Sequence, residues 1–228
     1  MSLLILLPRQ DNGDRWRDVA HEWVTKELAQ DFPEATILTC ELPDDEPWNK
    51  AKALEQGKDA AKDHELVVMH DADVYCEGLM LAVEALTDHE WAIPHKGVFR
   101  LDKYSTFAVY AGEDLDTDMG LEQRAYPGTV GGGIVAMHAE TFLRVPMDPR
   151  FEGWGQEDDA WALALYMLAE HPWRGKAPLF HLYHEPQERL SRRIGSIESK
   201  SLLRRYGRAR TPEDMQALID EVPTCSQP

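Results

Sequence analysis

Two aspartates follow an apolar segment that has the composition of a buried strand. Residues 66–69 (LVVM) lead through His70 into Asp71 and Asp73, which are separated by one residue. Carboxylates at the end of an apolar strand are costly to desolvate unless a cation pairs with them, and two at this spacing can share one divalent ion. The spacing therefore predicts a metal site at the end of this strand. Solvated acidic loops carry the same pattern, so taken alone it leaves both interpretations open.

A second group of reactive side chains lies in residues 153–159, with the sequence GWGQEDD. The two glycines allow a tight turn that presents the indole of Trp154, and an indole face is a common platform for a sugar ring. Glu157, Asp158 and Asp159 then fall in the first turn of an expected helix, where the helix dipole favours negative charge. A helix that caps itself with acidic residues would explain the three acids, but not the Gly-Trp-Gly before them.

Two histidines, His181 and His184, lie at the end of a late apolar segment. A neutral imidazole is a frequent ligand of Mn²⁺ or Zn²⁺, although a single histidine is more often a structural residue. The sequence contains no HExxH motif, so a zinc protease has no support.

Apolar strands and helices alternate along the first 95 residues. The strands are expected at 3–7, 35–40, 66–69 and 91–94, and the helices at 14–32, 48–61 and 78–86. This alternation predicts a parallel, doubly wound α/β sheet. Ligands of such sheets bind beyond the carboxyl ends of the strands, and Arg9 and Asp71 both follow a strand end.

The rest of the chain is expected to complete a single domain. Residues 96–127 are predicted to form long loops with a short hairpin. After Gly131, Gly132 and Gly133 come a strand and short helix over 134–143, a helix over 157–168, a strand over 179–183 and two C-terminal helices, the second starting at Thr211 and Pro212. We divide the domain into a nucleotide-binding half (1–95), an acceptor half (96–185), and a lid with a C-terminal helical extension (186–228), the lid being drawn from residues 185–200.

Composition narrows the class of partner. The chain has 228 residues, with 24 Lys and Arg against 41 Asp and Glu, for a net charge of −17. Proteins that bind nucleic acid gain affinity by neutralising phosphates, so no nucleic-acid partner is expected. Three cysteines without a CxxC pair indicate reduced thiols and a cytoplasmic protein, bacterial or in the host cell of a phage. The apolar residues 3–7 are too few to span a membrane.

The order of these motifs is more specific than any one of them. D-x-D is followed by G-G-G with a strand, by G-W-G-x-E-D-D and by a histidine, and the segments Pro8-Arg9 and 47–52 (PWNKAK) precede them. In this order the chain resembles the β-1,4-galactosyltransferases and their bacterial and phage relatives. The resemblance covers residues 3 to about 185, and G-W-G-x-E-D-D is its specific element.

The resemblance implies a GT-A fold, a Rossmann-like, mostly parallel central sheet flanked by helices, with C-terminal helices added. It implies a metal-dependent hexosyltransferase that moves a sugar from a nucleotide-diphosphate sugar, UDP-linked, to an acceptor hydroxyl with inversion. The acceptor would be a carbohydrate, a protein or a small molecule, and the metal Mn²⁺ or Mg²⁺.

The resemblance also implies a role for each matching residue. Asp158 would be the catalytic base. Asp73 and His184 would bind the metal, with His181 as the alternative to His184. Side chains lining the nucleotide and diphosphate would be Pro8, Arg9, Trp48, Lys50 and Asp71, while Gly132 would let the donor sugar approach closely. Trp154, Glu157 and Asp159 would bind sugar or acceptor.

Alternatives to this function stay open. The sequence shows none of the stem, anchor and paired cysteines of the animal enzymes, and residues 96–127 have no match, so donor sugar and acceptor are not specified. Retaining GT-A transferases that transfer N-acetylgalactosamine also carry Gly-Trp-Gly-x-Glu, but tend to have Asn where this chain has Asp158. Phosphatases of the haloacid dehalogenase type carry Thr or Val at the position of Tyr75. Their D-x-D follows the first strand, whereas here it follows the third. A non-catalytic sugar-binding relative would not need an acid at Asp158.

Overall fold

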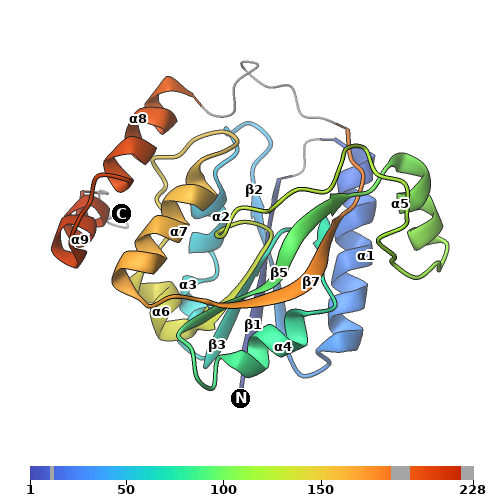
Figure 1. Ribbon diagram of the computed structural model, residues 1–228, viewed down its shortest axis with the longest axis horizontal. Coiled ribbons are helices and arrows are strands. Elements are labelled where there is room, and N and C mark those ends of the chain that lie inside the picture. Colours follow the sequence, from blue (N-terminus) through green and yellow to red (C-terminus); the bar gives the residue numbers. More distant parts are fainter. Residues whose placement is uncertain (11–12, 186–195, 222–228) are drawn as a thin grey trace.

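A seven-stranded sheet forms the centre of the computed structural model, which describes residues 1–10, 13–185 and 196–221. The strand order is β2-β1-β3-β6-β5-β7-β4 (Figure 1). Their bounds are β1 (Leu3–Gln10), β2 (Thr36–Leu42), β3 (Leu66–His70), β4 (Val74–Tyr75), β5 (Trp91–Arg100), β6 (Ile134–His138) and β7 (Trp173–His181). Neighbours β1 and β2, β1 and β3, and β5 and β7 are parallel, whereas β6 and β4 run antiparallel to the strands beside them. Strands β2, β1, β3, β5 and β7 therefore share one direction, which confirms the prediction of a mostly parallel α/β sheet.

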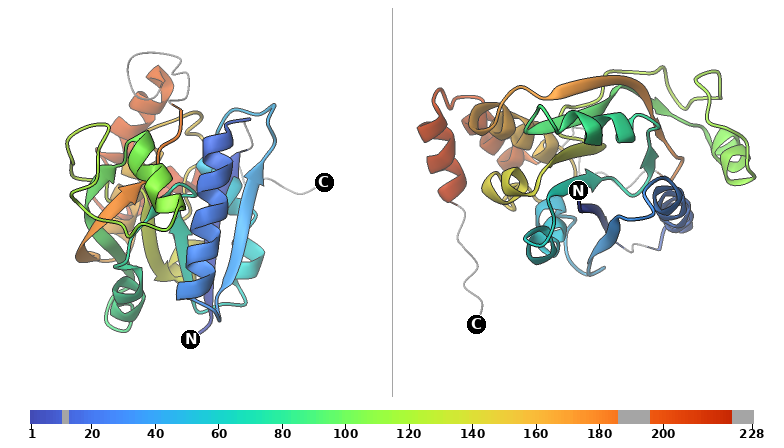
Figure 2. Two further views of the ribbon diagram at one scale, coloured as in Figure 1. Left: turned by 90° about the vertical axis from the view of Figure 1, so that its right-hand side faces the viewer. Right: turned by 90° about the horizontal axis from the view of Figure 1, so that it is seen from below.

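Helices cover both faces of the sheet because side chains alternate along each strand. In β1, Leu4 and Leu6 point into one core while Leu3, Ile5 and Leu7 point into the other. The first core is closed by α2 (Lys50–Glu55), α3 (Lys58–Ala61), α6 (Ala139–Arg144), α7 (Glu157–Leu168), α8 (Ile197–Tyr206) and α9 (Pro212–Asp220). The second is closed by α1 (Arg15–Asp31), α4 (Leu79–Ala85) and α5 (Lys103–Tyr110). Helices α8 and α9 lie at one end of the molecule and α5 at the other (Figures 1 and 2).

Capping chemistry fixes several helix starts where the sequence predicts them. Asp14 accepts a hydrogen bond from the backbone N–H of Trp16 and caps α1. Thr211 and Asp214 form a capping box around Pro212 at the start of α9. These contacts satisfy backbone donors that the first turn of a helix leaves without partners.

Two predicted elements differ in form. The helix predicted over 48–61 is two helices, α2 and α3, because Gly57 interrupts it and glycine is a poor helix former. The strand predicted after Gly133 is present as β6, but it runs antiparallel to both β3 and β5. The sheet is therefore mixed, and the segment that precedes β6 enters from the carboxyl ends of the parallel strands.

The region after residue 90 is more regular than predicted. Strand β5 runs from Trp91 to Arg100, and its pairing with β7 shifts register on both sides of His95. Pro94 has no backbone donor, and an irregular stretch accommodates it. The predicted loops of 96–127 contain α5, which begins after the cap Asp102.

The C-terminal helices belong to the first core. Asp148 accepts hydrogen bonds from Arg150 at 2.8 Å and from the Tyr206 hydroxyl at 2.8 Å. Arg150 also lies 3.0 Å from Glu221, just after α9. Residues 196–221 are thus tied to the segment that leads into α7. The division at residues 95 and 185 stays a prediction, and 186–195, the main part of the predicted lid, lie outside the described residues.

Two expectations drawn from composition concern thiols and membranes. Cys40 and Cys76 are buried free cysteines, and Cys225 lies outside the described residues. None of the helices described here combines the length and apolar character that a membrane span requires.

Candidate functional site

A pocket opens at the carboxyl ends of the parallel strands, as expected for a sheet of this kind. Nine of the residues singled out in the sequence line it: Pro8, Arg9, Trp48, Lys50, Asp71, Asp73, Trp154, His181 and His184. Five further residues complete the lining: Gln10, Arg17, His21, Ala72 and Arg100. The chain thus brings together the ends of β1, β3, β5 and β7.

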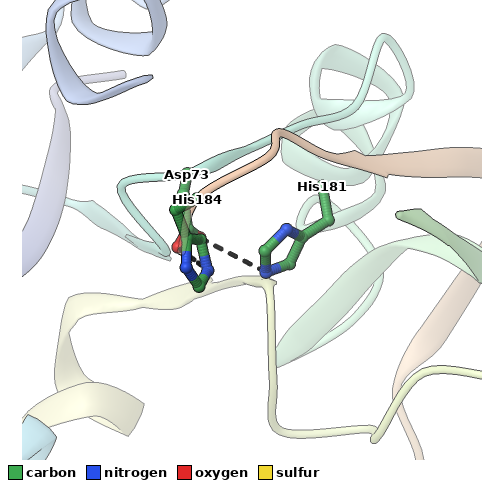
Figure 3. A group of neighbouring side chains, drawn as sticks. All are labelled: Asp73, His181 and His184. Carbon is green, nitrogen blue, oxygen red and sulfur yellow. Dashed lines mark ion pairs between the residues drawn. The ribbon is translucent and has the colours of Figure 1, made fainter. Parts of the chain in front are cut away.

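Strand pairing places Asp73 beside the two histidines. Val74 of β4 pairs with His181 of β7, and the backbone N–H of Leu182 donates to the carbonyl of Asp73 at 2.8 Å. His184 Nε2 then lies 3.3 Å from Asp73 Oδ2, and His181 Nε2 4.0 Å from Oδ1 (Figure 3). One ligand atom from each of the three residues lies within 4.8 Å of the others.

Backbone carbonyls orient both imidazoles toward Asp73. Nδ1 of His181 lies 2.9 Å from the Leu182 carbonyl, and Nδ1 of His184 lies 2.9 Å from the Glu185 carbonyl. A carbonyl can only accept, so a neutral imidazole in either place carries its proton on Nδ1 and turns the lone pair of Nε2 toward the carboxylate. Such a lone pair and a carboxylate oxygen repel each other unless a cation lies between them. Histidines that bind metals commonly have the ring nitrogen that faces away from the ion held by a carbonyl or a carboxylate in this way.

Electrostatics keep Asp73 ionised and His181 neutral. Burial by itself raises the pKa of Asp73, but His181, His184, Arg17 and Arg100 more than offset it and lower the pKa to about 2. Burial lowers the pKa of His181 to about 4. A charged oxygen and a neutral imidazole are the protonation states that bind a divalent cation.

Arg17 reaches the same cluster and was not singled out in the sequence. Its Nη1 lies 3.6 Å from Asp73 Oδ2, and its Nη2 lies 3.2 and 3.4 Å from the two ring nitrogens of His184. The available signal was positional: α1 starts just after β1 ends, so its first turn must face the same edge of the sheet as Asp73. Arg100 was missed because β5 is longer than predicted.

Lys50 joins Asp71 to Asp158. Its buried Nζ lies 2.8 Å from Asp71 Oδ1 and 2.9 Å from Asp158 Oδ1. Burial lowers the pKa of Lys50, but Asp158, Asp71 and Glu157 raise it well above its ordinary value, so the side chain is a permanent cation. Asp71 is held further by Gly133, whose N–H donates to Oδ2 at 3.2 Å. The resemblance assigned Lys50 to the nucleotide; here it organises two carboxylates.

Asp158 sits against the glycines that precede β6. A Cβ added at Gly132 would lie 2.7 Å from Asp158 Oδ2, so only glycine leaves room for this carboxylate. Burial raises the pKa of Asp158 to about 6; Lys50 works against this rise and Asp71 adds to it. Neither Gly132 nor Asp158 is among the residues that line the pocket, and Asp158 is connected to it through Lys50.

The turn before α7 fixes Trp154 over Trp48. Gly153 and Gly155 have φ of +79° and +99°, and Gln156, the N-cap residue, has a φ of +79°, which is uncommon for a residue other than glycine. The Gly153 N–H donates to the Trp48 carbonyl at 2.8 Å. The indoles of Trp48 and Trp154 stack, with centroids 5.0 Å apart and planes 14° apart, and Trp154 stays 41% exposed.

The remaining residues that were singled out have different surroundings. Glu157 is buried, and burial together with the charge of Asp158 raises its pKa to about 8. Asp159 is exposed, and neither residue lines the pocket. Arg9 is engaged by Asp18 at 2.9 Å and by Glu41 at 3.6 Å.

Comparisons with known proteins identify the fold. No model of a protein family matches the chain, and no curated protein matches it. A solved structure of a Drosophila β-1,4-galactosyltransferase 7 mutant, in complex with manganese, UDP-Gal and xylobiose, matches with a TM-score of 0.52 and 15% identity over 93% of this chain and 84% of that one. The chain shares the fold of a β-1,4-galactosyltransferase. The prediction of a GT-A fold is confirmed.

Two further structures score lower. GalNAc-T7, solved with UDP, GalNAc and Mn²⁺, is 11% identical over 81% of this chain and 44% of that one, with a TM-score of 0.48. Mannosyl-3-phosphoglycerate synthase from Rubrobacter xylanophilus is 14% identical over 91% and 73%, with a TM-score of 0.47. The fold assignment rests on the first structure alone.

Proposed function

We propose that this protein is a metal-dependent glycosyltransferase that moves a sugar from a nucleoside-diphosphate sugar to an acceptor hydroxyl. The observation that carries the proposal is the cluster of Asp73, His181 and His184, which lies in the same pocket as three arginines at the carboxyl end of the sheet. The fold alone would not suffice, because one fold hosts many activities.

The charge of the pocket suits a diphosphate. The protein carries a net charge of −17, yet its pocket is lined by four permanent cations, Arg9, Arg17, Lys50 and Arg100, against two carboxylates. A local excess of positive charge attracts a small anion to the pocket, even though the protein as a whole is acidic. A nucleoside diphosphate is an anion of this size.

Asp73, His184 and His181 would hold the metal. Carboxylate and imidazole ligands fit Mn²⁺, and Mg²⁺ would rely more on the carboxylate. When bound, the cation would act as a Lewis acid that stabilises charge on the departing diphosphate. The sequence left His181 and His184 as alternatives, whereas the geometry supports a role for both.

Asp158 is the proposed base. The acceptor oxygen attacks the anomeric carbon, the bond from that carbon to the diphosphate oxygen breaks, and the diphosphate leaves with the electron pair. The acceptor proton passes to Asp158, whose Oδ1 is engaged by Lys50 and whose Oδ2 faces Gly132. A carboxylate with a pKa raised toward neutrality is suited to general-base catalysis.

The donor and the stereochemistry are finer parts of the proposal. A UDP-sugar is the proposed donor, on the strength of the motif order in the sequence. A single base without a carboxylate nucleophile gives one displacement and therefore inversion, so an α-linked donor would yield a β-linked product. The anomeric coupling constant of the product decides this, and an α-linked product would favour a retaining enzyme instead.

The central experiment combines a panel of nucleotide sugars with Mn²⁺ and a chelator. Thermal shift and donor hydrolysis should both require Mn²⁺, and Asp73→Ala should remain folded but lose metal-dependent nucleotide binding. Asp63→Ala is a matched control, since Asp63 is exposed and distant from the pocket. Full activity in excess EDTA would refute the metal-dependent function, and binding without any turnover across acceptors would favour a non-catalytic relative.

A further inference from the structure

Among the described residues, no polar contact that holds the Arg17 side chain in the pocket is shorter than 3.2 Å. Its guanidinium lies 3.6 Å from Asp73 Oδ2, 3.2 and 3.4 Å from the ring nitrogens of His184, and 3.7 Å from Asp14 Oδ2. Charge-assisted hydrogen bonds of a fixed ion pair are about 2.7–2.9 Å long. Arg150 with Asp148, at 2.8 Å, is such a pair in this protein.

The Arg17 guanidinium also retains unused donors. Its Nε is buried and makes no hydrogen bond to the described part of the chain. Its carbon Cζ lies over the Trp154 ring, 5.0 Å from the centroid, and the side chain is 18% exposed. The side chain thus spans the pocket from α1 to the GWG turn, and can form stronger bonds than those it makes here.

Two of the other pocket cations are committed more firmly. Lys50 lies 2.8 Å from Asp71, and Arg9 lies 2.9 Å from Asp18. Arg100 lies 3.6 Å from Glu122, as far as Arg17 lies from Asp73, but Glu122 is not a proposed metal ligand. Among these four cations, Arg17 is the one whose guanidinium contacts the proposed metal ligands Asp73 and His184 directly.

A guanidinium in this place competes with a dication. It neutralises the carboxylate that a metal would bind, approaches the imidazole nitrogen that would coordinate, and repels a like charge at short range. An anion placed between the two cations reverses the sign of this effect, because each cation is then attracted to it. Phosphate oxygens also offer the bidentate partner that a guanidinium prefers.

We propose that Arg17 opposes binding of the metal when no donor is present, and becomes a ligand of the donor's diphosphate when both are bound. The inference rests on the proposed function, because it needs a dication at Asp73 and His184. Metal and nucleotide would then bind cooperatively, with Arg17 as the group that couples them. The free protein would hold metal weakly, and the ternary complex would hold it firmly.

This role predicts effects of opposite sign from one substitution. Arg17→Gln removes the competing charge, so the dissociation constant of Mn²⁺ without nucleotide should fall by at least about fivefold, the lower end of typical coupling between sites. The same variant lacks a phosphate ligand, so the dissociation constant of UDP in saturating Mn²⁺ should rise by at least about fivefold. A residue that only supports the fold would weaken both.

The experiment measures binding without turnover. Free Mn²⁺ is followed by electron paramagnetic resonance and UDP binding by calorimetry, on the full chain. Arg15→Gln is the matched control. Arg15 is exposed and lies on the same helix, and its substitution by Gln removes the same charge. Circular dichroism and thermal melting in chelator establish that both variants are folded. Should the Gln variant not fold, Arg17→Met, which keeps a long side chain but also carries no charge, should shift both constants in the same directions.

The outcomes separate this inference from the proposed function. Opposite shifts in Arg17→Gln, with Arg15→Gln unchanged, support it. If the wild type binds Mn²⁺ with UDP but Arg17→Gln weakens Mn²⁺ binding or leaves either constant unchanged, the inference is overturned and the proposed function stands. If the wild type binds no Mn²⁺ even with UDP present, the metal-dependent function fails and the role of Arg17 fails with it.

Discussion

Removal of the buried ammonium at Lys50 should destabilise the protein in a way that depends on pH. Lys50 is 4% exposed and contacts Asp71 and Asp158 at 2.8 and 2.9 Å. At an effective dielectric constant of about 20, each contact is worth roughly 4 kcal/mol or more before desolvation, and burial of the ammonium cancels a large part. Removing one partner of a buried pair typically costs about 3–5 kcal/mol, which is the loss we expect for Lys50→Met at pH 8.

The pH dependence follows from the direction of one pKa shift. The pKa of Asp158 is raised in the folded protein, so its ionisation costs stability as the pH rises through about 6. Without Lys50 this cost is larger. The loss caused by Lys50→Met should therefore be full at pH 8 and smaller at pH 5, where a protonated Asp158 needs no cation.

Urea denaturation at the two pH values measures the effect. For a protein of this size the loss corresponds to a fall in Tm of roughly 6–20 °C. Adding Asp158→Asn to Lys50→Met should recover about 1–3 kcal/mol at pH 8, since the amide needs no cation. Lys52→Met is the control: Lys52 is on the same helix and pairs with Glu46 at 3.5 Å on the surface, so it should cost less than about 1 kcal/mol. A loss below about 1 kcal/mol for Lys50→Met, or one that is equal at both pH values, would refute the reasoning.

Four further predictions concern catalysis and stability. Asp158→Asn should lower kcat by about 10²–10⁴-fold while donor affinity by calorimetry stays near that of the wild type; near-normal turnover would place the base elsewhere. In the wild type, kcat/KM should fall about tenfold per pH unit below about 6, because a base with a raised pKa must lose its proton to act, and a flat profile from pH 5 to 8 would contradict this. Trp154→Ala should raise the KM for donor or acceptor more than it lowers kcat, and unchanged KM values for both would exclude a stacking role. Tyr206→Phe should cost about 1.5–3 kcal/mol in urea, because its buried hydroxyl donates to Asp148 at 2.8 Å, whereas Tyr104→Phe at an exposed position should be neutral.

The sequence predicted the elements whose burial shows in their composition. The apolar residues 66–69 form the buried strand β3, and the fully buried residues of β1 are likewise an unbroken apolar run. Helix α5 escaped prediction because it buries Thr106 and Val109 and exposes Tyr104 and Phe107. Its apolar residues therefore do not mark the face that packs.

The site could be predicted only as far as strand ends define it. Asp71 and Asp73 follow β3, and Arg9 lies near the end of β1. Because the carboxyl ends of parallel strands meet at one edge of the sheet, the sequence could predict that these residues lie close together. The contact of Lys50 with Asp158 joins residues 108 positions apart and depends on how the α7 turn packs on the glycines. No local pattern encodes such a distance.

The pairing of β4 with β7 has a consequence for synthesis of the chain. Asp73 emerges early, but its histidine partners come from the last strand of the sheet, and Val74 has no strand to pair with until residues 180 and 181 arrive. A nascent chain that ends shortly after β3 would contain Asp73 but neither His181 nor His184. Because His181 ends the last strand of the described sheet and His184 follows it, the proposed metal cluster can form only after all the strands of this sheet have been synthesised. Metal binding at the proposed site would therefore report that β4 and β7 have paired.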